Sequence, residues 1–315
     1  MNTIGLDLGG TRVKMALIQD GSIQETAVLP SFSAKGLKPL LPVLARYINN
    51  LLDLYNLRAD DLDGIGASMP GIVDSKNMKL LTVYEKYEDA NSVDLTGWAR
   101  ENWDVPLVLE NDARCALIGE WKYGKGQGYD NVAIMTLGTG IGTSAVIEGK
   151  VLRGKHFMAG VLGGHFILDW DGLQCNCGNR GCAEALSSSW NLKTICQQFP
   201  EYEDSRLSQA GDPDFKLIFE HAAEGDEVAR KIRDHCMEVW VHAIANLIYA
   251  YDPEIIILSG GVMASRDVIL PYIRRRIKAF GWAPFDQIKF EVSDHFESSA
   301  LISAEYLVQS QSDKR

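Results

Sequence analysis

Apolar residues gather in short runs near the N-terminus. Runs at residues 3–8, 13–18 and 23–29 have the length of β-strands, and the turn sequences Gly-Gly-Thr and Asp-Gly separate them. The pattern predicts that the chain opens as a three-stranded meander. The first turn contains Gly9, Gly10 and Thr11. Glycines there allow the N–H groups of a loop to surround phosphate oxygens, although an ordinary hairpin turn has the same composition.

The same pattern returns in the middle of the chain. An apolar run at residues 131–136 is followed by a glycine-rich segment at 137–143, a second run that ends at residue 147, and the turn Glu148-Gly149. Two copies at similar spacing predict a duplicated domain, with one phosphate-binding hairpin from each half facing a shared cleft. Neither loop matches the P-loop sequence or the Gly-x-Gly-x-x-Gly that opens a helix, so a Rossmann site is not expected.

Longer amphipathic segments alternate with the remaining short runs. Apolar residues at helical spacing predict helices at residues 40–55, 113–121, 184–195, 227–251, 266–280 and 298–308. Short apolar runs predict strands at residues 64–68, 107–109, 255–258 and 288–292. The polar residues 200–213 predict an exposed connection. This alternation of strands and helices indicates an α/β fold.

The composition narrows the class of protein. The 315-residue chain is 46% hydrophobic and 23% charged, which suits a globular protein large enough for two domains. Its formal net charge of −11 and pI near 5.1 argue against a surface for nucleic acid or anionic membrane. No apolar run is long enough to span a bilayer, and the first residues lack the pattern of a signal peptide. We therefore expect a cytoplasmic protein with no nucleic-acid or membrane partner.

One histidine and three cysteines lie close together, at His165, Cys175, Cys177 and Cys182. Cys3His is one of the tetrahedral ligand sets of closed structural zinc sites. Reduced, buried cysteines beside a core histidine would have the same residue types, but three of the six cysteines fall within eight residues of a glycine-containing loop. Clustered thiols also suit a metal in a reducing compartment better than a disulfide framework. We predict a structural zinc site, with another thiolate-binding ion as the alternative.

A carboxylate follows the apolar run at residues 107–109. The sequence there is Glu110-Asn111-Asp112, and the helix predicted from residue 113 begins directly after it. An Asp at this place has a structural explanation as the N-cap of the helix. The carboxyl end of a parallel strand in an α/β sheet is also where ligands bind. The residues alone leave both explanations of Asp112 open.

Several short motifs together resemble the ROK family, which contains bacterial sugar kinases and related repressors. The motifs occur in the family's order over essentially the whole chain, and the histidine and triple-cysteine motif is the most specific of them. The matching segments are Asp7-Leu8-Gly9-Gly10-Thr11, Pro70-Gly71, Glu110-Asn111-Asp112, Leu137-Gly138-Thr139-Gly140-Ile141-Gly142, Gly164-His165, Cys175-Asn176-Cys177-Gly178-Asn179-Arg180-Gly181-Cys182 with Glu184, and Ser259-Gly260-Gly261.

The resemblance implies the actin-like, ribonuclease H-like ATPase fold, with two α/β domains hinged around a cleft. We expect a smaller domain of residues 1–110 plus 295–315, and a larger one of residues 111–294 that carries the zinc motif. The resemblance also implies an ATP-dependent, glucokinase-like sugar kinase that phosphorylates a hydroxyl, usually the 6-hydroxyl, of a hexose or N-acetylhexosamine. Family members commonly form dimers or tetramers, so a homodimer or homotetramer is expected.

The resemblance also implies roles for single residues. The ATP phosphates would be held by Gly9, Gly10, Thr11, Gly138, Thr139 and Gly140, with Gly260 and Gly261 against the adenosine and Asp7 orienting hydrated Mg²⁺. Sugar hydroxyls would be bound by Gly71, Asn111, Asp112, His165 and Glu184, and Asp112 would be the catalytic base. A zinc ion would hold one nitrogen of His165 and leave the other as an N–H donor to the sugar.

The sequence departs from the family at one position of the sugar site. Kinases of the family usually carry Glu-x-Gly-His, whereas this chain has Leu162-Gly163-Gly164-His165. A leucine accepts no hydrogen bond, and a sugar hydroxyl left unpaired costs roughly 1–3 kcal/mol. Two hypotheses follow: a kinase for another sugar or with weakened activity, and a non-catalytic sugar-binding sensor without a DNA-binding domain. Asp7, both glycine loops and Asp112 favour the kinase.

Overall fold

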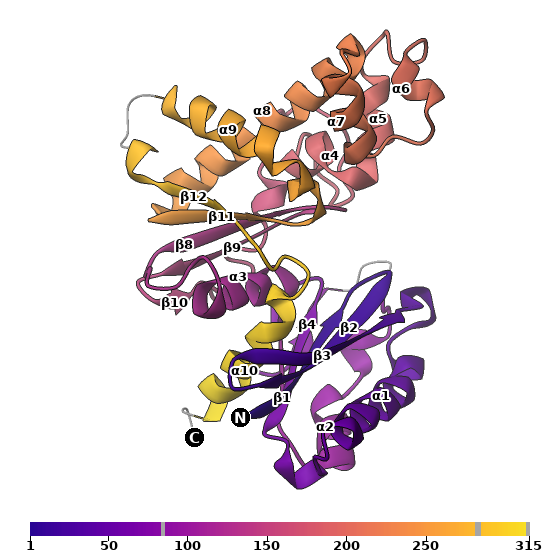
Figure 1. Cartoon of the computed structure of the whole chain (residues 1–315), viewed down its shortest axis with the longest axis vertical. Coiled ribbons are helices and arrows are strands. Elements are labelled where there is room, and N and C mark those ends of the chain that lie inside the picture. The colour runs from indigo at the N-terminus through magenta and orange to yellow at the C-terminus, as the bar shows by residue number, and fades with distance from the viewer. Residues whose placement is uncertain (83–85, 281–284, 313–315) are drawn as a thin grey trace. The chain divides into compact units, whose positions relative to one another are not determined.

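The computed structural model describes residues 1–82, 86–280 and 285–312 of the chain. The chain divides into two compact units, which we describe separately (Figure 1). The first unit contains Met1–Gly128, Arg153–Ala159 and the C-terminal segment from His295 onward. The second unit contains Tyr129–Leu152 and Gly160–Asp294. Among the described residues, each unit is built on a five-stranded sheet with helices packed against it, as the predicted α/β class requires.

The sheet of the first unit has the strand order β3-β2-β1-β4-β7. The strands are β1 (Asn2–Leu8), β2 (Arg12–Gln19), β3 (Ser22–Pro30), β4 (Gly64–Met69) and β7 (Leu107–Asn111). The first three are antiparallel, which confirms the predicted meander, whereas β4 is parallel to β1 and β7 is parallel to β4. This pairing aligns the carboxyl ends of three strands. It places Asp7 beside Ser68, and Met69 beside Asn111.

Helices cover both faces of this sheet. They are α1 (Leu41–Leu54), α2 (Leu95–Trp103), α3 (Asp112–Tyr123) and α10 (Ser299–Ser312), and a small hairpin of β5 (Val73–Asp74) and β6 (Lys79–Leu80) follows β4. Alternate side chains of β1, such as Leu6, belong to an apolar cluster with α1 and α2. On the other face Gly5 and Gly66 lie against the backbone of α10, the yellow helix of Figure 1. A side chain at either glycine would push this helix off the sheet.

The boundary of the first unit lies further along the chain than residue 110. Residues 111–128, which we expected in the other domain, belong to the first unit. The reason is the packing of α3 along α10, where Gly119 meets the carbonyl group of Ser299. Arg153–Ala159 also belongs to this unit, although the residues on both sides of it belong to the second.

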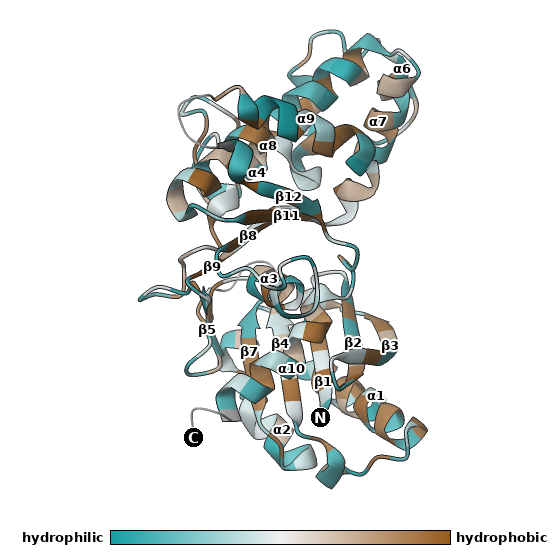
Figure 2. Cartoon of the chain, turned by 60° about the vertical axis from the view of Figure 1, so that its left-hand side comes forward, coloured by the Kyte–Doolittle hydropathy of each residue, from teal (hydrophilic) through white to brown (hydrophobic). Residues whose placement is uncertain are grey.

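The sheet of the second unit repeats the arrangement of the first, with the order β10-β9-β8-β11-β12. Its strands are β8 (Val132–Leu137), β9 (Ile141–Ile147), β10 (Lys150–Val151), β11 (Ile255–Ser259) and β12 (Lys289–Val292). β8 pairs antiparallel with β9 and parallel with β11, just as β1 pairs with β2 and β4. The hydrophobic β8 and β11 are brown in Figure 2. The duplication predicted from the two hairpins is therefore confirmed at the level of strand pairing.

The helices of the second unit pack together against its sheet and share one hydrophobic core with it. They are α4 (Ala183–Ser187), α5 (Leu192–Gln197), α6 (Arg206–Gln209), α7 (Phe215–Ala223), α8 (Glu227–Tyr251) and α9 (Arg266–Lys278). The buried Trp240 of α8 belongs to this core, with its ring centroid 5.3 Å from that of Phe215. α6 lies inside the stretch predicted as an exposed connection and buries Leu207. Among the described residues, no helix combines the length and the apolar character needed to cross a membrane.

The helix predicted at residues 184–195 is wrong as a single element. The structure ends α4 at Ser187 and begins α5 at Leu192, with a 3₁₀ turn (Ser189–Asn191) between them. The backbone N–H groups of Ser189 and Trp190 donate to carbonyl groups of the second glycine loop, 3.1 Å away in each case. Periodicity predicted a continuous helix because the apolar spacing continues through the break. A long-range hydrogen-bonding requirement interrupts it.

Candidate active site

The first glycine loop connects β1 to β2. The hydroxyl group of Tyr87 donates to the carbonyl oxygen of Gly9 at 2.9 Å. The hydroxyl groups of Ser31 and Ser33 both donate to the carbonyl oxygen of Gly10, at 2.5 and 2.6 Å. The loop is therefore fixed by its carbonyl groups, and Thr11 beside it is exposed.

Asp7 lies at the end of β1, one residue before this loop. The Ser68 hydroxyl donates to its carboxylate at 2.9 Å, as the pairing of β1 with β4 requires. Burial raises the pKa of Asp7, and the Ser68 hydrogen bond and the charge of Lys14 partly offset that effect. A half-buried carboxylate at a strand end can orient a hydrated cation, because carboxylate oxygens accept hydrogen bonds from the water molecules that surround such a cation.

Asn111 connects three parts of the candidate sugar site. Its side-chain oxygen accepts from the N–H group of Arg114 at 3.1 Å, which makes Asn111 the N-cap of α3. Its amide nitrogen donates to the carbonyl oxygen of Gly71 and to the carboxylate of Asp112, both at 2.9 Å. The N-cap explanation of Asp112 is therefore wrong. Since Asn111 caps the helix, the carboxylate of Asp112 is available for another purpose.

The carboxyl group of Asp112 has a pKa near neutrality. The protein around it desolvates the carboxylate and raises the pKa to about 6, and the charge of Asp7 contributes. Hydrogen bonds from the N–H of Ala113 and from Asn111 act in the opposite direction. Asp112 nevertheless has an exposed face. A carboxylate with this pKa is mostly ionised at pH 7 and still basic enough to accept a proton from an alcohol during reaction.

The second glycine loop connects β8 to β9 and is held by the segment after α4. The carbonyl oxygens of Gly138 and Thr139 accept from the N–H groups of Ser189 and Trp190. The carboxylate of Glu184 accepts from the N–H of Ile141 at 2.9 Å and from the indole of Trp190 at 3.2 Å. A Cβ atom at Gly140 would lie only 2.5 Å from that carboxylate. Glycine at this position lets Glu184 approach the loop.

Gly260 and Gly261 follow β11 and lie next to the second glycine loop. β11 is parallel to β8, so Ser259 lies beside Thr136. Gly260 has φ +95° and lies directly against the carbonyl oxygen of Leu137. No side chain fits there without moving the backbone, whereas no atom of the described residues beyond its chain neighbours lies within 4 Å of a Cβ built on Gly261. The second sheet therefore brings the four predicted glycines and Thr139 to one edge.

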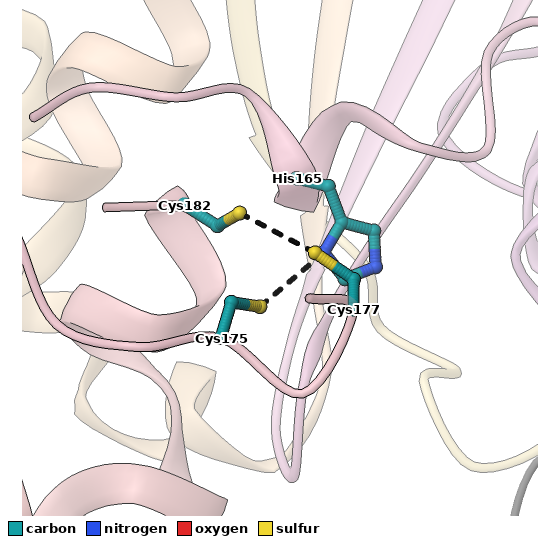
Figure 3. A group of neighbouring side chains, drawn as sticks. All are labelled: His165, Cys175, Cys177 and Cys182. Atoms are coloured by element: carbon teal, nitrogen blue, oxygen red, sulfur yellow. Dashed lines mark hydrogen bonds between the residues drawn. The ribbon is translucent and has the colours of Figure 1, made fainter. Parts of the chain in front are cut away.

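The predicted metal ligands come together in the second unit (Figure 3). One ligand atom from each of His165, Cys175, Cys177 and Cys182 can be chosen so that all four lie within 4.8 Å of one another. The sulfur atoms of Cys177 and Cys182 are 3.6 Å apart, and the sulfur of Cys175 is 3.7 Å from Nδ1 of His165. Bonds of ~2.3 Å to sulfur give tetrahedral edges of about 3.8 Å around zinc. The four side chains therefore fit a Cys3His zinc site.

The loop that carries these ligands is fixed by backbone contacts. Isolated β-bridges pair Ile167 with Cys182 and Gln174 with Arg180. Gly181 has φ +64°, and a side chain at this position would collide with the carbonyl oxygen of Asp169. His165 sits in the 3₁₀ turn Gly163–His165, which begins after Leu162 and packs against the start of β9. The histidine thus lies between the cysteine loop and the strand that leaves the second glycine loop.

A family model described as the ROK family matches residues 3–311. The chain belongs to the ROK family.

The chain is also similar to sugar kinases of known type. A glucokinase of Thermotoga maritima is 30% identical over 88% of this chain and 87% of its own. A solved ROK family glucokinase from Streptomyces griseus, in complex with glucose and AMPPNP, is 27% identical, with TM-score 0.79 and coverage of 98% of this chain and 100% of that one. A ROK hexokinase structure from Thermus thermophilus is 25% identical, with TM-score 0.80 and full coverage of both chains. The fold is the actin-like ATPase fold of ROK sugar kinases.

The two units divide the ROK motif residues between them. The first unit brings Asp7, Gly9, Gly10, Thr11, Gly71, Asn111 and Asp112 to the carboxyl edge of its parallel strands. The second unit brings together Gly138, Thr139, Gly140, Glu184, Gly260 and Gly261. His165 belongs to the cysteine cluster of the same unit, in a turn that packs against the start of β9. Each group is therefore assembled within its own unit.

One feature of this ROK chain was missed in the sequence: an ion network beneath Asn111 and Asp112. Glu110 and Arg114, each 0% exposed, form a salt bridge of 3.2 Å, and Arg153 approaches the other oxygen of Glu110 at 2.8 Å. Arg114 also donates to the carbonyl oxygens of Phe157 and Ala159, at 2.8 and 2.9 Å. Glu110 accepts from the N–H of Asn111 at 2.9 Å. The i,i+4 spacing of Glu110 and Arg114 was the available signal, but it is also common on solvated helix faces.

Proposed function

We propose that this chain is an ATP-dependent sugar kinase. It transfers the γ-phosphoryl group of ATP to a hydroxyl group, the 6-hydroxyl, of a hexose or N-acetylhexosamine. The single observation that carries the proposal is Asp112, a carboxylate with a pKa of about 6 held by Asn111 at the end of a parallel strand. The relatives described above, including one with glucose and AMPPNP bound, support a kinase that acts on sugars.

In this proposal, the residues around Asp112 bind and activate the sugar. Asn111, the backbone at Gly71, His165 and Glu184 hydrogen-bond its hydroxyl groups, and Asp112 accepts the proton of the attacking hydroxyl. Each carboxylate oxygen can accept more than one hydrogen bond, so the single bonds that Ile141 and Trp190 donate to the two oxygens of Glu184 leave capacity for a sugar. Holding the hydroxyl in line with the phosphoryl group supplies much of the rate enhancement in phosphoryl transfer.

The glycine residues are proposed to hold the nucleotide. N–H groups of residues 9–11 and 138–140 surround the phosphates, and Gly260 and Gly261 pack against the adenosine. Asp7 orients the hydrated Mg²⁺ that accompanies ATP. When bound, this cation neutralises charge on the β- and γ-phosphates.

The Cys3His cluster is proposed to hold zinc as a structural ion. Four protein ligands leave no open coordination position for chemistry. Nδ1 of His165 faces the cysteines, so a metal bound there leaves Nε2 as an N–H donor. The metal site would then orient a sugar-binding side chain.

Leu162 supports a second candidate, a non-catalytic sugar sensor of the same fold. This residue immediately precedes the turn that carries His165, at the place where ROK kinases usually have a hydrogen-bonding glutamate. The deciding experiment measures ADP release from Mg-ATP with a panel of hexoses and N-acetylhexosamines. Turnover with any of these sugars supports the kinase. Sugar binding by calorimetry without turnover, in folded protein that holds its metal, would favour the sensor.

The pKa of Asp112 predicts a pH dependence. The base form of a carboxyl group with pKa about 6 is lost as the pH falls below that value, so kcat/KM for the sugar should fall about tenfold per unit below pH 6. An Asp with an ordinary pKa of ~3.9 would leave the rate unchanged down to about pH 4.5. The measurement is kcat/KM between pH 5 and 8, with circular dichroism as the control for folding. A flat profile over this range would remove Asp112 as a base with a raised pKa.

The zinc proposal predicts about one metal ion per chain, because the four ligands complete one tetrahedral site. Cys175→Ser should purify without the ion and bind sugar more weakly, because His165 loses its fixed orientation. Cys196→Ala is the matched control, since this buried cysteine lies outside the cluster. Elemental analysis by mass spectrometry and sugar binding by calorimetry are the measurements. Wild-type protein purified under reducing conditions without a thiolate-binding metal would contradict the proposal.

A further inference from the structure

Lys86 lies over the first glycine loop. A Cβ atom built on Gly10 would be 2.6 Å from the ammonium nitrogen of Lys86 and 2.5 Å from its Cε. The lysine side chain therefore occupies the space that any other residue at position 10 would fill. Lys86 is exposed to solvent, so its charge is accessible to a ligand at the loop.

The neighbouring Tyr87 explains this position. Tyr87 is 1% exposed, its hydroxyl donates to the carbonyl oxygen of Gly9, and its N–H donates to that of Ser33 at 2.9 Å. Burial raises the pKa of Tyr87 to about 12, so the phenol keeps its proton and remains a donor. Ser33 in turn donates to the carbonyl oxygen of Gly10. Lys86 is thus the chain neighbour of Tyr87, which is hydrogen-bonded to the first glycine loop.

No ion pair among the described residues accounts for the position of the Lys86 ammonium group. Within residues 1–82, 86–280 and 285–312, Lys86 forms no ion pair with a carboxylate. Lys14 on β2, by contrast, donates to the carbonyl oxygen of Glu297 at 3.1 Å. An ammonium group with no ion pair among the described residues, placed against a loop of partly exposed glycines, favours an anionic ligand, and phosphate is the anion that such loops bind.

We propose that Lys86 binds the terminal phosphates of the nucleotide at the first glycine loop and neutralises the charge that develops during transfer. This inference rests on the proposed kinase function. In the step, the sugar oxygen forms a bond to the γ-phosphorus, and the bond from that phosphorus to the bridging oxygen breaks. ADP leaves with the electron pair of the broken bond. The hydroxyl proton passes to Asp112, and Lys86 keeps its proton throughout. Such a cation lowers the barrier because the phosphates carry the developing negative charge.

The test compares Lys86→Ala and Lys86→Arg with Lys79→Ala, a control at an exposed lysine of the same unit. Lys86→Ala should lower kcat/KM for ATP by about 10²–10³-fold, as loss of one charge-stabilising group does, with KM for the sugar changed less than about twofold. Lys86→Arg should recover most of the loss, and Lys79→Ala should behave as wild type. Wild-type kinetics for Lys86→Ala would overturn the proposal.

Calorimetry separates this proposal from the kinase function. Lys86→Ala should bind Mg-AMPPNP about tenfold or more weakly than wild type, while adenosine, which has no phosphate, should bind both proteins equally. This result would support the role of Lys86 even in a protein that phosphorylates no sugar. Equal affinity of Lys86→Ala and wild type for Mg-AMPPNP would overturn it, whether or not the kinase is active.

Discussion

Asp112→Asn is expected to lower kcat by about 10²–10⁴-fold, the contribution typical of a positioned general base. The amide of the variant keeps the size of the side chain and can still accept a hydrogen bond from the N–H of Ala113, as the carboxylate does. It cannot take the proton of the attacking hydroxyl at neutral pH. Because Asn111 caps α3, the substitution should leave the helix start intact. Steady-state kinetics with the best sugar of the panel is the measurement.

Two further observations make this test specific. Asp53→Asn, at an exposed position on α1, is the matched control and should retain wild-type kcat. The fall in kcat/KM below pH 6 should disappear in Asp112→Asn, because the titrating group is gone. A variant with more than a tenth of the wild-type kcat would assign the base to another residue.

Arg114→Ala is expected to lower the free energy of unfolding by about 3–5 kcal/mol, as removal of one partner of a buried ion pair does. The guanidinium group is 0% exposed, and it carries the salt bridge to Glu110 and the hydrogen bonds to Phe157 and Ala159. Its loss leaves the Glu110 carboxylate buried, with Arg153 as its remaining ion-pair partner among the described residues. The measurement is urea titration followed by circular dichroism. If the two units unfold in separate transitions, the variant and the wild type are compared in the transition at the lower urea concentration.

The exposed Arg100 of α2 provides the control, since Arg100→Ala should change the free energy of unfolding by less than about 0.5 kcal/mol. A double variant, Glu110→Gln with Arg114→Met, should recover part of the stability because it removes the uncompensated charge. A loss of less than about 1 kcal/mol in Arg114→Ala would show that water or a rearranged Arg153 compensates the carboxylate.

The ion network also has a consequence for the site. Glu110 accepts from the N–H of Asn111, so the network holds the peptide that carries the N-cap and the proposed base. The same network fixes Arg153–Ala159, which leads directly to the turn that carries His165. The ion pair therefore supports the strand end that supplies two proposed sugar ligands, Asn111 and Asp112.

Local pattern was sufficient for the elements whose signals lie within a few residues. The apolar runs and turns predicted β1, β2 and β3, and the second copy of that pattern predicted the strand pairing of β8 and β9. The spacing of Cys175, Cys177 and Cys182 restricted those ligands to one loop, since so few residues separate them. Short helices were harder to find: α2 and α7 were not predicted, because a nine-residue segment offers little periodicity.

The sequence by itself determined the α/β class, the duplicated glycine hairpins, the Cys3His cluster and the location of Asp112 at a strand end. Only the tertiary structure decided that Asn111 caps α3, that the helix around residue 188 breaks to bind the second glycine loop, and that Lys86 lies on the first. It also decided that α3 belongs with α10, and that Glu110 pairs with both Arg114 and Arg153. The physical reason is common to most of these features. Each depends on a hydrogen bond, ion pair or close contact between residues far apart in the sequence, whereas local pattern reports only which residues share a face of one element.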